Sequence, residues 1–302
     1  MKVITKLLLI PVLPIICLCC SSFNTPPAIP HYDHIIIVME ENHGYNELIG
    51  SANAPFINYL AKNGALFTDS HGVTHPSQPN YLALFSGSTQ GSTNDDCLDA
   101  ITPFTSPNLG AALIHNGLTF KGYAQTMPSV GFIGCTYLQS KLTVGTLYAR
   151  KHTPWVNWLG TGTNGIPRSC SLPMTDFPSD YSKLPTVAFV VPDMDYDMHN
   201  IGTPGDRAAI ERGDKWLKEN LAAYAQWAAK HNSLLIVTFD EDDYSPQNNN
   251  RIPTIFFGDH VVAGKYNAAI THYNVLHTLE AMYNLPVTDN NTAEAITSIW
   301  KK

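Results

Sequence analysis

The sequence is poor in charged residues and has no excess of basic ones. Asp, Glu, Lys and Arg make up 14% of the 302 residues, and the formal net charge at pH 7 is −7. A protein that binds the nucleic-acid backbone needs a basic surface, so the negative net charge argues against nucleic acid as a partner. Hydrophobic residues, at 44%, are numerous enough for a sizeable buried core.

Internal repeats and low-complexity linkers are also missing, so a single domain is the simplest interpretation. Residues 1–22, MKVITKLLLIPVLPIICLCCSS, nevertheless form a segment of their own. Lys2 and Lys6 precede an apolar run, Leu7–Leu18, that two prolines interrupt and that is too short for a comfortable membrane span. This layout predicts a secretory signal peptide, one domain over residues 23–302, and a protein that is exported, either periplasmic or secreted.

Cysteine is scarce, and no pair has a metal-binding CxxC spacing. Three of the six cysteines lie at the end of the predicted signal peptide: Cys17, Cys19 and Cys20. A lipidated cysteine there would tether the protein to a membrane, although plain cleavage and release is the favoured interpretation. The other three, Cys97, Cys135 and Cys170, allow one disulfide bond and one spare thiol in an exported protein. We expect Cys135 to pair with Cys170.

Short apolar runs alternate with helix-like stretches along the rest of the chain. Four runs predict strands, and those that are continuously apolar predict burial on both faces: 34–40, 186–192, 234–240 and 254–258. Three stretches predict helices: 54–64, 206–231 and 271–285. This alternation predicts an α/β fold, a three-layer sandwich with a largely parallel central sheet. Ligands of such folds bind beyond the carboxyl ends of the strands.

Acidic and polar residues follow three of these predicted strands. The three clusters are Glu40-Glu41-Asn42-His43-Gly44, residues 193–200 (DMDYDMHN) and Asp240-Glu241-Asp242-Asp243. Because parallel strands end at the same edge of a sheet, we expect the clusters to converge. Carboxylates held close together repel one another and protonate, unless a bound cation removes that cost. Oxygen ligands suit Mg, Ca or Mn, and Zn or Fe are further candidates.

Any one of these clusters could instead contain helix caps or solvated loop charges, and we expect that of Glu40 and Asp243. Ser77, in the stretch HPSQPNYLALFSG, raises the same choice. It lies at or near the start of a predicted helix over 78–85, where free backbone N–H groups favour a phosphate. Contact with a metal would turn its hydroxyl into an effective nucleophile, whereas an ordinary N-cap is the alternative.

Taken together, these segments resemble the phosphoesterase family that contains bacterial and fungal acid phosphatases and phospholipases C, a branch of the alkaline phosphatase superfamily. The matching stretches are HYDHIIIVMEENHGY, NGALFTDSHGVTHPSQPNYLALFSG, YARKHTPW, DMDYDMHN, LLIVTFDEDD, RIPTIFFGDH and ITHYNVLHTLEAMY. They follow the family's order over residues 31–285. The resemblance implies an alkaline phosphatase-like fold and a single phosphoesterase catalytic domain over 23–302.

The resemblance also implies a role for individual residues. It places one divalent metal ion, of unknown identity, on Glu41, Asn42, Ser77, Asp240 and Glu241. It makes Ser77 the nucleophile and either His152 or His199 the proton donor. It assigns phosphate binding to Asn42, Ser77, His152, His199 and, as a further member, His272. Asn80 is expected to be structural.

The implied reaction is hydrolysis of small phosphate monoesters, as in acid phosphatases, through a phosphoserine intermediate. A protonated imidazole as proton donor would fit activity at mildly acidic pH. The alternative within the family is a phospholipase C that acts on phosphodiesters of phospholipid head groups. A third possibility, a non-catalytic metal- or sugar-phosphate-binding protein, would have no need of the hydroxyl of Ser77. The sequence leaves the oligomeric state open.

Overall fold

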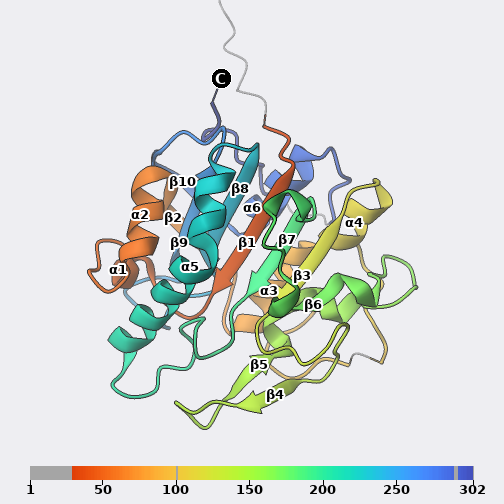
Figure 1. Ribbon diagram of the computed structural model, residues 1–302, viewed down its shortest axis with the longest axis horizontal. Helices are drawn as coiled ribbons and strands as arrows, with labels where there is room; N and C mark the ends of the chain where they lie inside the picture. The colour runs from red at the N-terminus through yellow and green to blue at the C-terminus, as the bar shows by residue number, and fades with distance from the viewer. Residues whose placement is uncertain (1–28, 100, 289–291, 302) are drawn as a thin grey trace, which may run out of the picture.

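The computed structural model describes residues 29–99, 101–288 and 292–301. An eight-stranded sheet forms its centre, in the order β10-β2-β9-β8-β1-β7-β3-β6 (Figure 1). The predicted signal peptide and its three cysteines lie outside the described residues. Within the described ranges, every helix is too short or too polar to cross a membrane.

The central sheet is largely parallel, as predicted. Its strands are β1 (His34–Glu40), β2 (Ala65–His71), β3 (Phe120–Ala124), β6 (Ser171–Pro173), β7 (Val187–Val191), β8 (Ser233–Phe239), β9 (Arg251–Gly258) and β10 (Gly264–Thr271). Neighbouring strands run parallel except where β9 pairs with β2 and with β8. The four predicted strands appear as β1, β7, β8 and β9, which confirms the α/β fold class.

Helices cover both faces of the sheet, and this explains the continuous apolar run of β1. The helices are α1 (Tyr45–Leu48), α2 (Pro55–Asn63), α3 (Ser77–Ser86), α4 (Leu109–His115), α5 (Asp206–Ala228) and α6 (His272–Met282). Ile35, Ile37 and Met39 pack in one hydrophobic cluster with residues of α3, α4 and α6. Ile36 and Val38 belong to the opposite cluster, with residues of α2 and α5 (Figure 1). Successive side chains of β1 therefore alternate between two cores.

A smaller hairpin and several short 3-10 helices complete the fold. The hairpin consists of β4 (Thr136–Gln139) and β5 (Thr146–Ala149). The 3-10 helices are η1 (Arg150–His152), η2 (Pro154–Trp158), η3 (Arg168–Cys170), η4 (Met174–Asp176) and η5 (Tyr181–Lys183). The hairpin packs on the segment that follows β7, where the backbone N–H of Met194 donates to the carbonyl of Leu147 at 2.8 Å.

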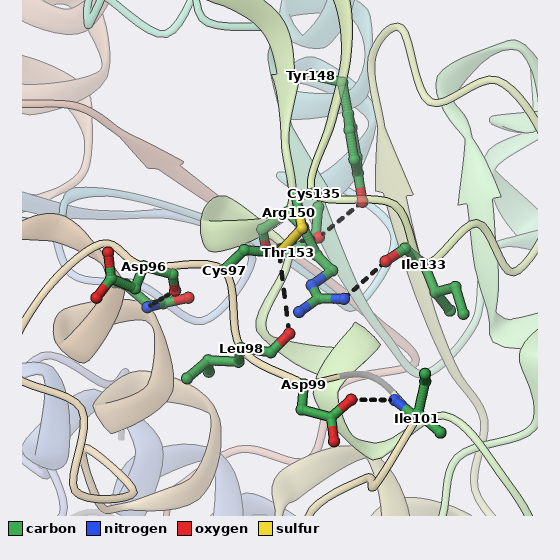
Figure 2. The surroundings of a disulfide bond; sticks show 11 residues. Asp96, Cys97, Leu98, Asp99, Ile101, Ile133, Cys135, Tyr148, Arg150 and Thr153 are labelled. Atoms are coloured by element: carbon green, nitrogen blue, oxygen red, sulfur yellow. Dashed lines mark hydrogen bonds between the residues drawn. A yellow bond between two sulfur atoms is a disulfide. The ribbon is translucent and has the colours of Figure 1, made fainter.

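The disulfide bond joins Cys97 to Cys135, so the expected pairing of Cys135 with Cys170 is wrong. Cys170 is a buried free thiol that packs in the same hydrophobic cluster as residues of α3, α4 and α6. Figure 2 shows the bond beside Arg150, whose guanidinium donates to the carbonyl of Ile133 at 2.6 Å. The backbone N–H of Arg150 also donates to the carbonyl of Cys135 at 2.9 Å. The bond therefore fastens the loop after α3 to the residue before β4, which is itself hydrogen-bonded to the first residue of η1.

Candidate active site

Three segments meet around Ser77 at the carboxyl ends of β1 and β8. Ser77 Oγ lies 3.0 Å from Glu41 Oε2, 3.4 Å from Asn42 Oδ1 and 3.3 Å from Glu241 Oε1. The backbone N–H of Asn42 donates to Asp240 Oδ1 at 3.1 Å. Strands β1 and β8 are parallel neighbours, so the residues that follow them leave the sheet side by side. The structure thus brings together the five residues that the sequence assigned to a metal site.

Ser77 is the first residue of α3 and is only 1% exposed. The N-cap is Pro76, with no side-chain capping bond, so the interpretation of Ser77 as an N-cap is wrong. Asn80 holds the preceding turn: its Oδ1 accepts from the N–H groups of Val73 and Thr74 at 2.8 and 3.1 Å. Its Nδ2 donates to the carbonyls of Thr74 and Pro76 at 2.8 and 3.1 Å. These bonds fit the structural role expected of Asn80.

The start of α3 is occupied by a carboxylate of the chain itself. The N–H of Gln78 donates to Asp95 Oδ1 at 2.9 Å, and Pro79 has no N–H to offer. Lys151 Nζ lies 2.6 Å from Asp95 Oδ2 and 3.4 Å from His199 Nε2. The expectation that the N–H groups after Ser77 bind phosphate is therefore not met at Gln78. Sequence reasoning missed Asp95 and Lys151, although Lys151 lies within the stretch YARKHTPW.

Both expected histidines lie beside the acidic residues. His152 is buried, with Nε2 3.0 Å from Glu41 Oε1 and Nδ1 3.2 Å from Asp197 Oδ2. Its ring stacks on that of Tyr81, whose hydroxyl donates to Glu41. The ring centroid of His199 lies 5.7 Å from that of His152, and its backbone N–H donates to Asp197 Oδ1 at 2.9 Å. Asp197 belongs to the acidic cluster 193–200 that was expected to converge here, although no role was assigned to it, and Tyr81 was not singled out from the sequence.

Two further histidines contact the acidic pair after β8. His272 is buried, and its Nε2 lies 2.7 Å from the backbone carbonyl of Asp240, to which it donates. This bond supports the backbone that presents Asp240. His75 bonds through Nδ1 to Glu241 and stacks on Tyr244 with ring centroids 4.0 Å apart. His75 lies in the quoted stretch around Ser77, but nothing in the sequence indicated its contact with Glu241.

The acidic groups are held in an environment that opposes their ionisation. Burial raises the pKa of Glu241 to about 9, and the neighbouring Asp240 adds to that rise. Burial also raises the pKa of Asp240 to about 6. The pKa of Glu41 is well above its usual value because of burial and then of Asp240, while Lys151 acts in the opposite direction. The site thus contains carboxylates whose charge has no full compensation from the chain.

The pKa values of the two histidines are shifted in the direction that favours the neutral ring. Burial, followed by the positive charge of Lys151, lowers the pKa of His152 well below its usual value. The same two causes lower the pKa of His199 to about 4. Burial therefore opposes protonation of both rings in the phosphate-free protein. This opposes the simple expectation drawn from the pKa of free histidine.

The donor groups fit a divalent metal ion. Within the described part of the chain, Glu41, His152 and Asp197 place ligand atoms within 4.8 Å of one another and could hold a metal ion. Asp240 Oδ2 is buried and makes no hydrogen bond, and the buried Asp197 Oδ2 has an ion-pair contact with His152 Nδ1 but no hydrogen bond. A cation would satisfy such oxygens and offset the mutual repulsion of the carboxylates. The oxygens around Ser77 form a second donor set that shares Glu41.

Of the two acidic residues expected to be caps or loop charges, only Asp243 is one. Its exposed carboxylate accepts from the backbone N–H of Ser245 at 3.2 Å and from Asn248 Nδ2 at 3.0 Å. Glu40 is wholly buried at the end of β1, and neither carboxylate oxygen makes a hydrogen bond. Burial, then the neighbouring Asp197, raises its pKa well above the usual value. The expectation for Glu40 is wrong because the last residue of β1 still faces a helix-covered core.

A cavity of about 270 Å³ opens beside these residues. It is lined by Asn42, His43, Glu47, Met198, His199, Ile201, Asp206, Asp243 and Tyr244. Asn42 and His199 belong to the group around Ser77, so the cavity is continuous with that group. A ligand that contacted Ser77 could therefore extend into this space.

Known proteins resemble this chain in sequence and in fold. The model of the phosphoesterase family matches residues 51–286. The phosphatidylinositol-3-phosphatase of Mycobacterium tuberculosis is 46% identical over 276 residues, which cover 90% of this chain and 84% of that protein. An acid phosphatase of Aspergillus fumigatus is 28% identical over 261 residues, which cover 84% of this chain but 56% of that protein.

The fold is shared with a solved structure that has little sequence in common with it. A protein of the alkaline phosphatase superfamily from Vibrio parahaemolyticus superposes with a TM-score of 0.59 at 13% identity, over 85% of this chain and 68% of that one. This likeness bears on the fold alone, whereas the family match covers most of the sequence. On that match and the 46% identity, the chain belongs to the phosphoesterase family and is a phosphoric ester hydrolase.

Proposed function

We propose that this protein hydrolyses phosphate monoesters through a phosphoserine formed on Ser77, with the help of one divalent metal ion. The observation that carries the proposal is the position of Ser77 Oγ, which is buried within 3.4 Å of oxygens from Glu41, Asn42 and Glu241. A hydroxyl in this place caps no helix. A protein that only bound a metal or a phosphate would not need it.

The metal would be held by oxygen ligands from the three converging segments: Glu41, Asn42, Ser77, Asp240 and Glu241. When bound, a divalent ion lowers the pKa of a coordinated hydroxyl and offsets charge on the phosphoryl oxygens. His152 lies between Glu41 and Asp197, so in this arrangement it orients Glu41 from behind.

The chain's own residues then divide the work of the first displacement. Ser77 Oγ attacks phosphorus in line, so that the Oγ–P bond forms while the bond from phosphorus to the alcohol oxygen breaks. The serine proton passes to a carboxylate in contact, and Glu41 Oε2 at 3.0 Å is the nearest. The side-chain amide of Asn42 and the ammonium of Lys151 donate to phosphoryl oxygens, where negative charge gathers. Attack of water on the phosphoserine reverses these steps and restores the hydroxyl.

His199 is better placed than His152 to protonate the leaving alcohol. Both ring nitrogens of His152 face carboxylate oxygens, at 3.0 and 3.2 Å. His199 lines the cavity, and its Nδ1 makes no hydrogen bond. Its pKa of about 4 belongs to the phosphate-free site, and a bound phosphate dianion beside the ring would raise it. His199 would thus acquire its proton together with the substrate.

The relatives' names favour a monoester. The protein from M. tuberculosis is named a phosphatidylinositol-3-phosphatase, and the fungal relative is named an acid phosphatase. Phosphodiester cleavage by a phospholipase C remains the alternative, and turnover of p-nitrophenyl phosphate against phosphatidylcholine separates the two. We further propose that the protein is exported, as residues 1–22 predict. The disulfide bond between Cys97 and Cys135 supports an oxidising compartment.

The test replaces the nucleophile and looks for the covalent intermediate. Ser77→Ala should lower turnover of p-nitrophenyl phosphate by a factor of about 1,000 or more, because the attacking atom is gone. Ser86→Ala is the matched control at the far end of α3, where Oγ donates to the carbonyl of Leu82 at 2.8 Å, within the helix. Acid quench followed by peptide mass spectrometry should find phosphate on Ser77. Near wild-type turnover in Ser77→Ala, or a label on another residue, would contradict the assignment.

A further inference from the structure

The cavity beside Ser77 has a lining rich in hydrogen-bond acceptors and negative charge. Glu47, Asp206 and Asp243 contribute carboxylates, whereas none of the residues that line it is Lys or Arg. Within the described ranges, these three carboxylates form no ion pair. Glu47 Oε2 accepts the backbone N–H of Gly44 at 2.7 Å, so its other oxygen is left for a ligand. The charge of this pocket therefore faces whatever enters it.

A buried histidine adds a ring nitrogen without a hydrogen bond to this lining. His43 lines the cavity, yet only 2% of it is exposed. Its Nδ1 lies 2.9 Å from the backbone carbonyl of Glu41, and a carbonyl can only accept, so Nδ1 carries the hydrogen. Its Nε2 has no hydrogen-bond partner in the described part of the chain. A ligand with N–H or O–H groups would satisfy it.

An aromatic ring completes the pocket on its exposed side. Tyr244 is 54% exposed and stacks on His75, which in turn bonds to Glu241. The face of a tyrosine ring attracts cations. Met198 and Ile201 provide the apolar part of the lining, which suits a short alkyl chain. Acceptors, negative charge, an aromatic face and a small apolar wall together match a protonated amine on a short carbon chain.

We propose that the preferred substrates are phosphate monoesters of small alcohols that carry a protonated amine. This inference rests on the proposed phosphatase function and concerns the leaving group alone. The phosphate lies against Ser77 and Lys151, while the amine enters the cavity among Glu47, Asp206 and Asp243. An alcohol that carries a second anion meets the same carboxylates with the opposite sign and is repelled.

Three substrates that differ chiefly in one charge test the inference on the metal-loaded enzyme. They are 2-aminoethyl phosphate, 2-hydroxyethyl phosphate and phosphoglycolate, which are cationic, neutral and anionic at the end remote from phosphorus. We expect kcat/KM to fall by about tenfold at each step, the size of one charge interaction near a partly exposed carboxylate. Equal kcat/KM for the three would overturn the inference while leaving the phosphatase intact. Failure to turn over these three and p-nitrophenyl phosphate would overturn the proposed function, and this inference with it.

Variants that neutralise individual carboxylates test which of them cause the preference for the amino substrate. The double variant Asp206→Asn, Asp243→Asn should lower the ratio of kcat/KM for the amino over the hydroxy substrate by about tenfold. Asp243→Asn alone, in an exposed loop, should lower the same ratio by about threefold, and it keeps the test valid if loss of Asp206 weakens the start of α5. Asp176→Asn, an exposed carboxylate that does not line the cavity, changes the net charge equally and should leave the ratio unchanged. A full preference in the double variant would refute the inference.

Discussion

Removal of the metal ion should destabilise this protein, and the loss should grow as the pH rises. The reason lies in Asp240, which is wholly buried and whose pKa burial raises to about 6. An aspartate in an unfolded chain titrates near pH 3.9. Between these values the unfolded chain releases its proton first. The stability that the protonated group provides is therefore present below about pH 3.9 and is lost as the pH rises through about 6.

The size of the effect follows from the gap between the two pKa values. A difference of about two pH units corresponds to about 3 kcal/mol in the free energy of unfolding. Glu241, whose pKa burial raises to about 9, acts in the same direction, and its contribution is lost progressively from about pH 4.3 up to about 9. A bound divalent cation removes the loss because it favours the ionised carboxylates. For a chain of this length about 3 kcal/mol is a shift in Tm of roughly 6 °C.

Buried histidines change the stability with pH in the opposite direction, so their contribution must be distinguished from that of the carboxylates. The pKa of His272 is lowered to about 4 by burial. Its contribution to stability is present above about pH 6.5 and is lost as the pH falls through about 4. The informative quantity is therefore the difference in Tm between metal-loaded and chelated protein at each pH. His272 donates to the backbone of Asp240 in both forms, so its titration largely cancels in that difference.

Thermal melts with and without chelator, at several pH values from about 5 to about 8, measure this difference. Asp240→Asn should remove the part of this pH dependence that lies below about pH 6, because the amide cannot ionise, whereas the part above about pH 6, which comes from Glu241, should persist. Elemental analysis also distinguishes the two donor sets, since loss of metal in Asp240→Asn supports the oxygens around Ser77. Loss of metal only in His152→Gln supports the set of Glu41, His152 and Asp197. A difference in Tm that is equal at every pH, or absent in protein proven free of metal, would refute the reasoning.

Two further predictions concern the side chains that frame the start of α3. Lys151→Met should lower kcat/KM for p-nitrophenyl phosphate by about 100-fold and weaken inhibition by inorganic phosphate, because it removes the cation 3.4 Å from His199; unchanged inhibition would contradict this role. Reduction of the disulfide between Cys97 and Cys135, 38 residues apart, should cost about 4 kcal/mol of stability and lower activity, since it frees the loop that holds Asp95. Cys97→Ser should reproduce both losses, and full activity in that variant would show that the bond does not position the loop.

The parts of the fold that could be predicted are the strands that are buried on both faces, because their sequences are continuously apolar. Strands β1, β7 and β8 are continuously apolar because helices cover both sides of them, and their parallel pairing aligns the residues that follow. Edge strand β10 was not predicted, since half of its residues are exposed and it has no apolar run. The antiparallel direction of β9 could not be predicted, because a strand that is buried on both faces has the same apolar pattern in either direction.

In the site, too, the residues next to predictable strands could be inferred, whereas contacts between distant segments could not. Glu41 and Asp240 could be inferred because each directly follows a recognisable strand. The anion at the start of α3 could not, because local reasoning gives only a helix end with free N–H groups. That anion is the carboxylate of Asp95, which accepts from the N–H of Gln78. Lys151, 56 residues further along the chain, pairs with Asp95 and supplies a positive charge at this place. In the proposed site the cation beside the phosphate is thus a side chain placed by the fold, and for this reason we expect phosphate binding to depend on Lys151 more than on the dipole of α3.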